Sequence, residues 1–122
     1  MTLRIPRKLL VLFLILSFGV LFYLSLSPPT DGHQSENALY EDKIEHVIAY
    51  GWLALLSAMA AKGKKSILAA VLGLIVLGMA LEYAQTFIPR RMFSPDDMLA
   101  NVFGVFVGVA LGMYVKSRRS WQ

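Results

Sequence analysis

The chain has 122 residues and a hydrophobic fraction of 57%, with a mean hydropathy of +0.58 and a formal net charge of +4. This length predicts a single domain, residues 1–122, and the apolar share exceeds the roughly 45–50% of soluble domains. The chain contains no cysteine, which excludes a disulfide framework, a thiolate nucleophile and a cysteine-based zinc site.

Four apolar blocks predict an all-α fold, a polytopic membrane protein with four transmembrane helices in a small bundle. The predicted spans cover about residues 9–26, 44–61, 67–88 and 98–115. Each approaches the ~20 residues that a helix needs to cross a bilayer. The first block also has the outline of a signal peptide, but Pro28-Pro29 occupies the place of cleavage and the run is long for an h-region. We therefore favour a retained anchor helix.

The second predicted span carries polar residues in its first half. Asp42 and His46 are four residues apart and share one helix face. A carboxylate one turn from an imidazole can orient a general base, but an interfacial histidine beside a capping aspartate has the same spacing. Both interpretations stay open. Lys43 lies beside this pair, and the short turn at residues 62–65 predicts that the second and third spans are antiparallel neighbours.

The third predicted span contains a carboxylate, Glu82, which lies six residues before Ile88. That is roughly 9 Å below the helix end at ~1.5 Å per residue. Gln85 follows one turn later on the same face. An unpaired carboxylate at that depth costs about 2.5 kcal/mol or more, so we expect Glu82 to be protonated or paired. A structural ion pair and a functional site are both open interpretations.

Ser94-Pro95-Asp96-Asp97 predicts the start of the fourth helix, with Ser94 as N-cap, proline at the first position and Asp97 as the capping acid. One turn later, Asn101 is an amide that needs buried partners. Gly104, Gly108 and Gly112 then form a stripe of small residues. Such a stripe allows close helix packing, either within the chain or in a homo-oligomer.

The distribution of charge predicts how the spans are oriented. Three segments, at the two ends of the chain and between the second and third spans, hold nine basic residues and no acidic one. Short loops rich in lysine and arginine remain in the cytoplasm, so we expect both termini there. The polar residues of the spans then share the outer leaflet, where we predict a pocket open to the outer surface formed by Asp42, Lys43, His46, Glu82, Gln85, Arg91, Asp97 and Asn101.

Two segments resemble the family of VanZ-like membrane proteins. Residues 42–53 resemble its D-K-x-x-H-x-x-x-Y-x-x-L segment, and residues 82–108 resemble its E-x-x-Q…R…D-x-x-x-N-x-x-G-x-x-x-G segment. The similar core covers about residues 42–112. Where the family has a single arginine, this chain has Arg90-Arg91, and we align Arg91 by its distance to Asp97, with Arg90 as the alternative.

The resemblance implies a multi-pass protein of the bacterial cell envelope, in the cytoplasmic (inner) membrane. The family is named for a protein that gives low-level teicoplanin resistance by lowering drug binding at the cell surface. No cofactor, metal ion or nucleic-acid partner is expected, because the sequence offers no metal-ligand cluster and its basic residues are explained by membrane orientation.

Three functions fit these residues. The first, which we favour, is a non-catalytic protein whose pocket binds the anionic head group of a lipid-linked or cell-wall-related molecule. Arg91 and Lys43 would supply positive charge, and Glu82, Gln85 and Asn101 would form the pocket floor. The second is an enzyme acting on a lipid-linked substrate, with His46 as base, oriented by Asp42 or Glu82, and Arg91 stabilising negative charge. The third is a helix-packing subunit that uses the glycine stripe.

Overall fold

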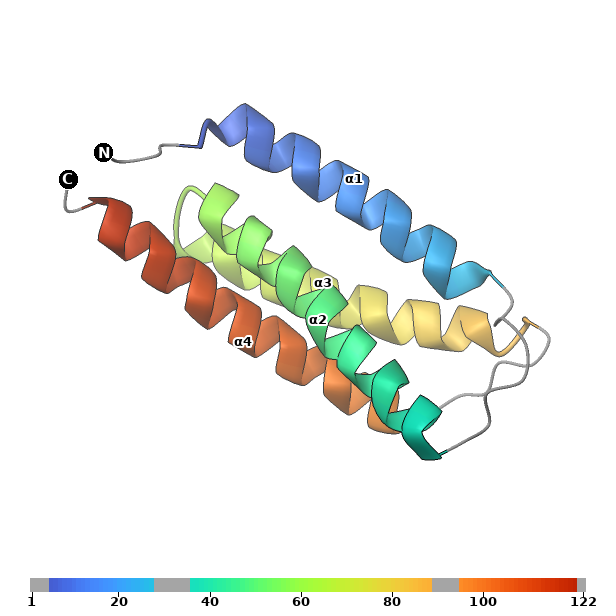
Figure 1. Cartoon of the computed structure of the whole chain (residues 1–122). Coiled ribbons are helices and arrows are strands. Elements are labelled where there is room, and N and C mark those ends of the chain that lie inside the picture. The colour runs from blue at the N-terminus through green and yellow to red at the C-terminus, as the bar shows by residue number, and fades with distance from the viewer. Residues whose placement is uncertain (1–4, 28–35, 89–94, 121–122) are drawn as a thin grey trace.

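The structure, a computed structural model, describes residues 5–27, 36–88 and 95–120, with side chains described for 5–27, 43–88 and 95–118. These residues form four α-helices (Figure 1): α1 (Arg7–Leu26), α2 (Glu36–Ala60), α3 (Lys64–Gln85) and α4 (Pro95–Ser120). The predicted all-helical fold is confirmed for this part of the chain.

The helices differ from the predicted spans at their ends. All four begin before the predicted apolar blocks, because helical hydrogen bonding continues into polar residues that an apolar window leaves out. At its other end α3 stops at Gln85, three residues before the predicted end. The backbone there tightens into i→i−3 hydrogen bonds at residues 86–88, and Thr86 Oγ1 donates to Tyr83 O at 2.6 Å. A threonine that bonds a nearby carbonyl competes with the helix, so Glu82 lies in the last turn of α3.

Three of the described helices are long and apolar enough to cross a membrane: α1, α3 and residues Pro95–Arg118 of α4. The second helix is not among them, because Lys43, Glu45 and His46 lower the hydropathy of its first half. Large apolar side chains are nevertheless exposed on all four helices. Soluble proteins rarely expose so large an apolar surface, so these helices belong to a membrane protein.

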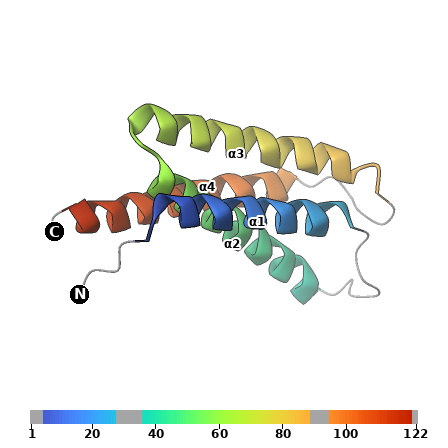
Figure 2. The ribbon, with the colours of Figure 1, turned by 90° about the horizontal axis from the view of Figure 1, so that it is seen from above.

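The helix ends fall into two groups. The start of α1, the end of α2, the start of α3 and the end of α4 lie together at one end of the bundle (Figure 1). Seen from above, α1 crosses over α2 with α3 at one side (Figure 2), and it contacts both of these helices. Only 11% of its apolar window is buried, which makes α1 the most peripheral of the three apolar helices.

The glycine stripe of α4 packs against the backbone of α2. A Cβ built on Gly108 would overlap Gly51 O, and one built on Gly104 would lie 2.6 Å from Val47 O. At Gly112 the added atom would lie 2.8 Å from both Leu55 O and Ala58 Cβ. Each four-residue step on α4 thus matches a step on α2 in the same direction, so the two helices are parallel and in backbone contact. The stripe is occupied within the chain, and the homo-oligomer through it stays a prediction.

Described basic residues gather where the starts of α1 and α3 meet the ends of α2 and α4. We call this group the basic end: Arg7, Lys8, Lys62, Lys64, Lys65, Lys116 and Arg118. Arg7 Nε donates to Ala60 O at 2.9 Å, and Lys116 Nζ donates to Ala61 O. The last carbonyls of a helix lack partners within it and carry partial negative charge. These two cations therefore tie α1 and α4 to the end of α2.

Candidate functional site

Four polar side chains are buried toward the opposite end of the bundle. Glu82 is 1% exposed, Asn101 3%, Gln85 5% and Asp97 8%. They come from the end of α3 and the start of α4, and α2 adds the half-buried Lys43 and His46. We call these six residues the polar cluster. Among the described side chains, no buried nitrogen or oxygen lacks a hydrogen-bond partner, so the buried polar atoms of the cluster are all satisfied.

His46 connects α2 to α4. Its Nδ1 lies 2.8 Å from Asn101 Oδ1, and its Nε2 lies 3.9 Å from Asp97 Oδ2. An amide oxygen only accepts hydrogen bonds, so Nδ1 carries the proton and Nε2 is directed toward the carboxylate. Asp97 and Asn101 are one turn apart on α4, and the imidazole therefore spans two successive turns of that helix.

Gly78 of α3 lets the Asn101 amide lie between three helices. A Cβ built on Gly78 would lie 3.1 Å from Asn101 Nδ2 and 3.4 Å from Tyr50 Cε1. Tyr50 is 2% exposed and follows His46 by one turn of α2, with the two rings nearly parallel at 3°. The glycine thus marks the point where α2, α3 and α4 meet beneath the polar cluster.

Glu82 and Gln85 face different neighbours. Glu82 follows Gly78 by one turn, and its carboxylate is close enough to Tyr50 of α2 to interact electrostatically. Gln85 turns toward α1, where its Nε2 donates to Ser25 O at 3.0 Å. This bond extends the network to the peripheral helix, a contact that the sequence analysis did not predict.

Lys43 is the described cation at the surface of the cluster. Its Nζ lies 3.9 Å from Asp96 Oδ2, with the two side chains 35% and 70% exposed. Exposed ion pairs contribute about 0–1 kcal/mol, so this pair leaves Lys43 free to meet another anion. Asp42 lies in α2, but its side chain falls outside the described residues, as do Arg90, Arg91 and Ser94.

The structure describes the side chains of six of the eight predicted site residues. It joins His46 to Asp97 and Asn101 of α4, buries Glu82 and Gln85 in the last turn of α3, and pairs Lys43 with Asp96. Sequence reasoning missed Gly78, although a small residue one turn before a buried carboxylate is a signal of close helix approach. It also assigned no role to Tyr50. The Ser25 contact uses a backbone carbonyl, which no residue type reveals.

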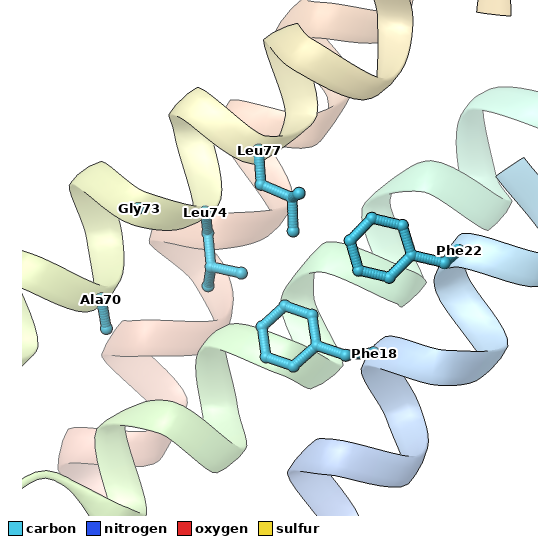
Figure 3. Close-up of a pocket in the computed structure, with 6 residues that line it drawn as sticks. All are labelled: Phe18, Phe22, Ala70, Gly73, Leu74 and Leu77. Atoms are coloured by element: carbon cyan, nitrogen blue, oxygen red, sulfur yellow. The ribbon is translucent and has the colours of Figure 1, made fainter. Parts of the chain in front are cut away.

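The described cavity lies away from the polar cluster. It is an apolar groove of about 370 Å³ between α1 and α3 (Figure 3), and none of the six cluster residues lines it. The described histidine, aspartate and glutamate residues form no group of three that could hold a metal ion. The predicted pocket at the polar cluster therefore stays a prediction.

Comparison with protein families identifies what kind of chain this is. The model of the VanZ/LLP1 family matches residues 9–116. The searches of curated proteins and of solved structures found no match. The family match includes the polar cluster and the glycine stripe, and it extends to α1, which the resemblance in the sequence did not cover. The chain belongs to the VanZ/LLP1 family.

Proposed function

We propose that the chain crosses the bacterial inner membrane four times, with both termini in the cytoplasm and the polar cluster at the outer leaflet. The fourth span is α2, whose 25 residues extend about 37 Å, longer than the ~30 Å hydrocarbon core. It contacts the other three helices, so its polar first half has protein neighbours rather than lipid alone. The basic end supports this orientation, because lysine- and arginine-rich ends stay in the cytoplasm.

Single cysteines test this orientation without background, because the chain contains no cysteine. Asp96 and Lys62 are exposed at opposite ends of the bundle. In intact cells we expect Asp96→Cys to react with a membrane-impermeant maleimide and Lys62→Cys to react only after permeabilisation. The reverse pattern, or labelling of both in intact cells, would refute the proposed topology.

The polar cluster, in our proposal, binds the anionic head group of a membrane lipid or lipid-linked cell-wall molecule. The observation that carries this is the burial of Glu82, Gln85, Asp97 and Asn101 toward one end of the bundle, while the other buried residues described are hydrophobic or glycine. Polar groups inside a membrane protein are costly and mark functional sites. A bundle that only had to fold would be at least as stable with apolar residues there.

The cluster also contains acids, so the source of positive charge needs an account. Glu82 is almost fully buried and interacts electrostatically with Tyr50, and Asp97 faces His46. Neither carboxylate therefore dominates the outer surface. Lys43 is partly exposed there. Arg91, six residues before Asp97 in the sequence, is the second cation of the proposal, and an arginine can bind a phosphate with two parallel hydrogen bonds.

Lipid retention tests the binding proposal. The protein is reconstituted in nanodiscs that contain equal amounts of phosphatidylglycerol and phosphatidylcholine. It is then released from the nanodiscs, and the lipids that remain bound to it are identified by native mass spectrometry. We expect wild type to retain phosphatidylglycerol, and Lys43→Ala and Arg91→Ala each to lower retention about tenfold, the effect of losing one charge-assisted hydrogen bond of about 1.5 kcal/mol. Lys62→Ala, which removes a cation at the basic end, is the matched control and should leave lipid retention unchanged. Equal retention of the two lipids by wild type would refute the proposal.

One observation favours an enzyme as the second candidate. His46 lies between two groups of α4, with Nδ1 2.8 Å from Asn101 Oδ1 and Nε2 3.9 Å from Asp97 Oδ2, and an imidazole beside a carboxylate is a pair that can exchange a proton. Of the described carboxylates, Asp97 is the one that pairs with His46. In the same nanodiscs, conversion of a lipid-linked molecule that stops in His46→Gln while lipid retention persists would favour the enzyme. A contribution to teicoplanin resistance rests on family membership alone.

A further inference from the structure

The seam between α1 and α3 contains a hollow that the chain itself does not fill. Phe18 and Phe22 point from α1 toward Leu74 and Leu77 of α3, with space between them (Figure 3). A Cβ built on Gly73, in the floor of the groove, would have no atom within 4 Å. The volume of about 370 Å³ falls in the range of roughly 300–1,000 Å³ that holds small ligands.

The surroundings of the groove indicate what fills it. Both of its walls belong to helices with the hydropathy of membrane spans, α1 and α3. The groove residues lie inside those helices, Phe18 and Phe22 in the second half of α1 and Ala70 to Leu77 in the middle of α3, a depth that belongs to the hydrocarbon region of a bilayer. A wholly apolar groove at that depth offers nothing to water, and a hydrocarbon chain is the occupant that matches its lining.

Both walls lead to the polar cluster. On α3, Leu77 is followed at four-residue steps by Leu81 and Gln85, and on α1, Phe22 is followed by Ser25. The Gln85–Ser25 hydrogen bond joins the same two helices at the polar end. At ~1.5 Å per residue the α3 wall of the groove extends from roughly 12 to 22 Å below Gln85, and the α1 wall from roughly 4 to 10 Å below Ser25. Half of the hydrocarbon core is about 15 Å, so a lipid whose head group lies at the cluster reaches the groove with the distal part of its chain.

We propose that the α1–α3 groove binds an acyl chain of the phospholipid whose anionic head group lies at the polar cluster. This rests on the proposed function and names its ligand as an intact lipid, held at both the head group and one chain. The peripheral helix α1 forms one wall of the site, through Phe18 and Phe22.

A photoreactive lipid tests the groove directly. The probe is phosphatidylglycerol with a diazirine near the end of one acyl chain, in nanodiscs that contain the full-length protein. We expect labels on Phe18, Phe22, Leu74 and Leu77 to exceed those on the exposed Phe103 and Phe106 of α4 about fivefold. The ratio is modest because lipid tails are as apolar as the groove, so only packing and the head group distinguish this place from the bilayer.

Variants that fill the groove supply the control. Gly73→Phe and Ala70→Phe should each abolish the enrichment. Gly19→Phe adds the same side chain at an equally open glycine of α1 that does not line the groove, and should preserve it. Even labelling of α1, α3 and α4 in wild type would overturn the proposal, as would a cross-link that places a second copy of the chain in the seam.

A different result would refute the head-group proposal. A phosphatidylcholine probe with the same diazirine should show no enrichment at the groove. If both probes label the groove equally, the chain site stands and the anionic head-group site is refuted. If phosphatidylglycerol is retained in mass spectrometry while labels spread evenly, the head-group site stands and the groove is refuted.

Discussion

Gly108→Ala should destabilise the bundle by about 3 kcal/mol or more, at or beyond the upper end of the usual cost of overpacking. The added Cβ would overlap Gly51 O and lie 2.8 Å from Ala54 Cβ. A backbone carbonyl cannot rotate away as a side chain can, so α2 and α4 would have to separate along their contact. Equilibrium unfolding in mixed micelles with increasing sodium dodecyl sulfate, followed by tryptophan fluorescence, measures the loss.

The same glycine-to-alanine substitution at two other positions tests whether the loss of stability comes from the contact at Gly108. Gly51→Ala, whose Cβ would lie 3.3 Å from Gly104 O, should cost much less than Gly108→Ala. Gly19→Ala meets nothing within 4 Å and should gain about 0.5–1 kcal/mol from helix propensity. Wild-type stability in Gly108→Ala would mean that α2 and α4 do not approach as closely as the structure shows.

Asn101→Ala should lower the free energy of unfolding by about 1–3 kcal/mol, the cost of leaving a buried polar group without its partner. The lost partner is Oδ1, which accepts from His46 Nδ1 at 2.8 Å. In a double-mutant cycle with His46→Ala, the coupling energy should fall within about 0.5–3 kcal/mol. The same micelle titration measures all four proteins of the cycle.

The matched control pairs His46→Ala with Gln85→Ala. Gln85 is equally buried in the polar cluster, but its amide nitrogen bonds Ser25 O of α1. These two changes should therefore add to within about 0.5 kcal/mol. Strict additivity of the His46 and Asn101 changes would instead show that the α2–α4 hydrogen bond contributes nothing to stability.

The sequence predicts the helices better than it predicts which helices pack against one another. Apolar blocks indicate four helices, and the structure has them, because block length and the absence of charge are local properties. The glycine stripe indicates close packing but does not name the partner, which the structure shows to be α2. The end of α3 was predicted at Ile88 and lies at Gln85, since the side chain of Thr86 competes for the helical carbonyls.

The same limit applies to the candidate site. Spacing along one helix paired His46 with Asp42, because residues four apart are the contacts a sequence reveals. The described partners of His46, Asp97 and Asn101, are more than fifty residues away, on α4. Their contact depends on the register between α2 and α4, which the glycine contacts set. Charge segregation predicted the common location of the cluster, but not its internal pairing.

The contact between α2 and α4 has a consequence for how the protein is made. The second helix ends at residue 60, and the glycines of α4 that pack against its backbone begin at residue 104. At about 5–20 residues per second, synthesis of the intervening segment takes roughly two to nine seconds. During that interval the helix with Lys43, Glu45 and His46 is present without its main packing partner. In the proposed four-span topology, α2 must therefore stay inserted until the last helix arrives, and a chain stopped before α4 would leave those polar groups without their partners on that helix.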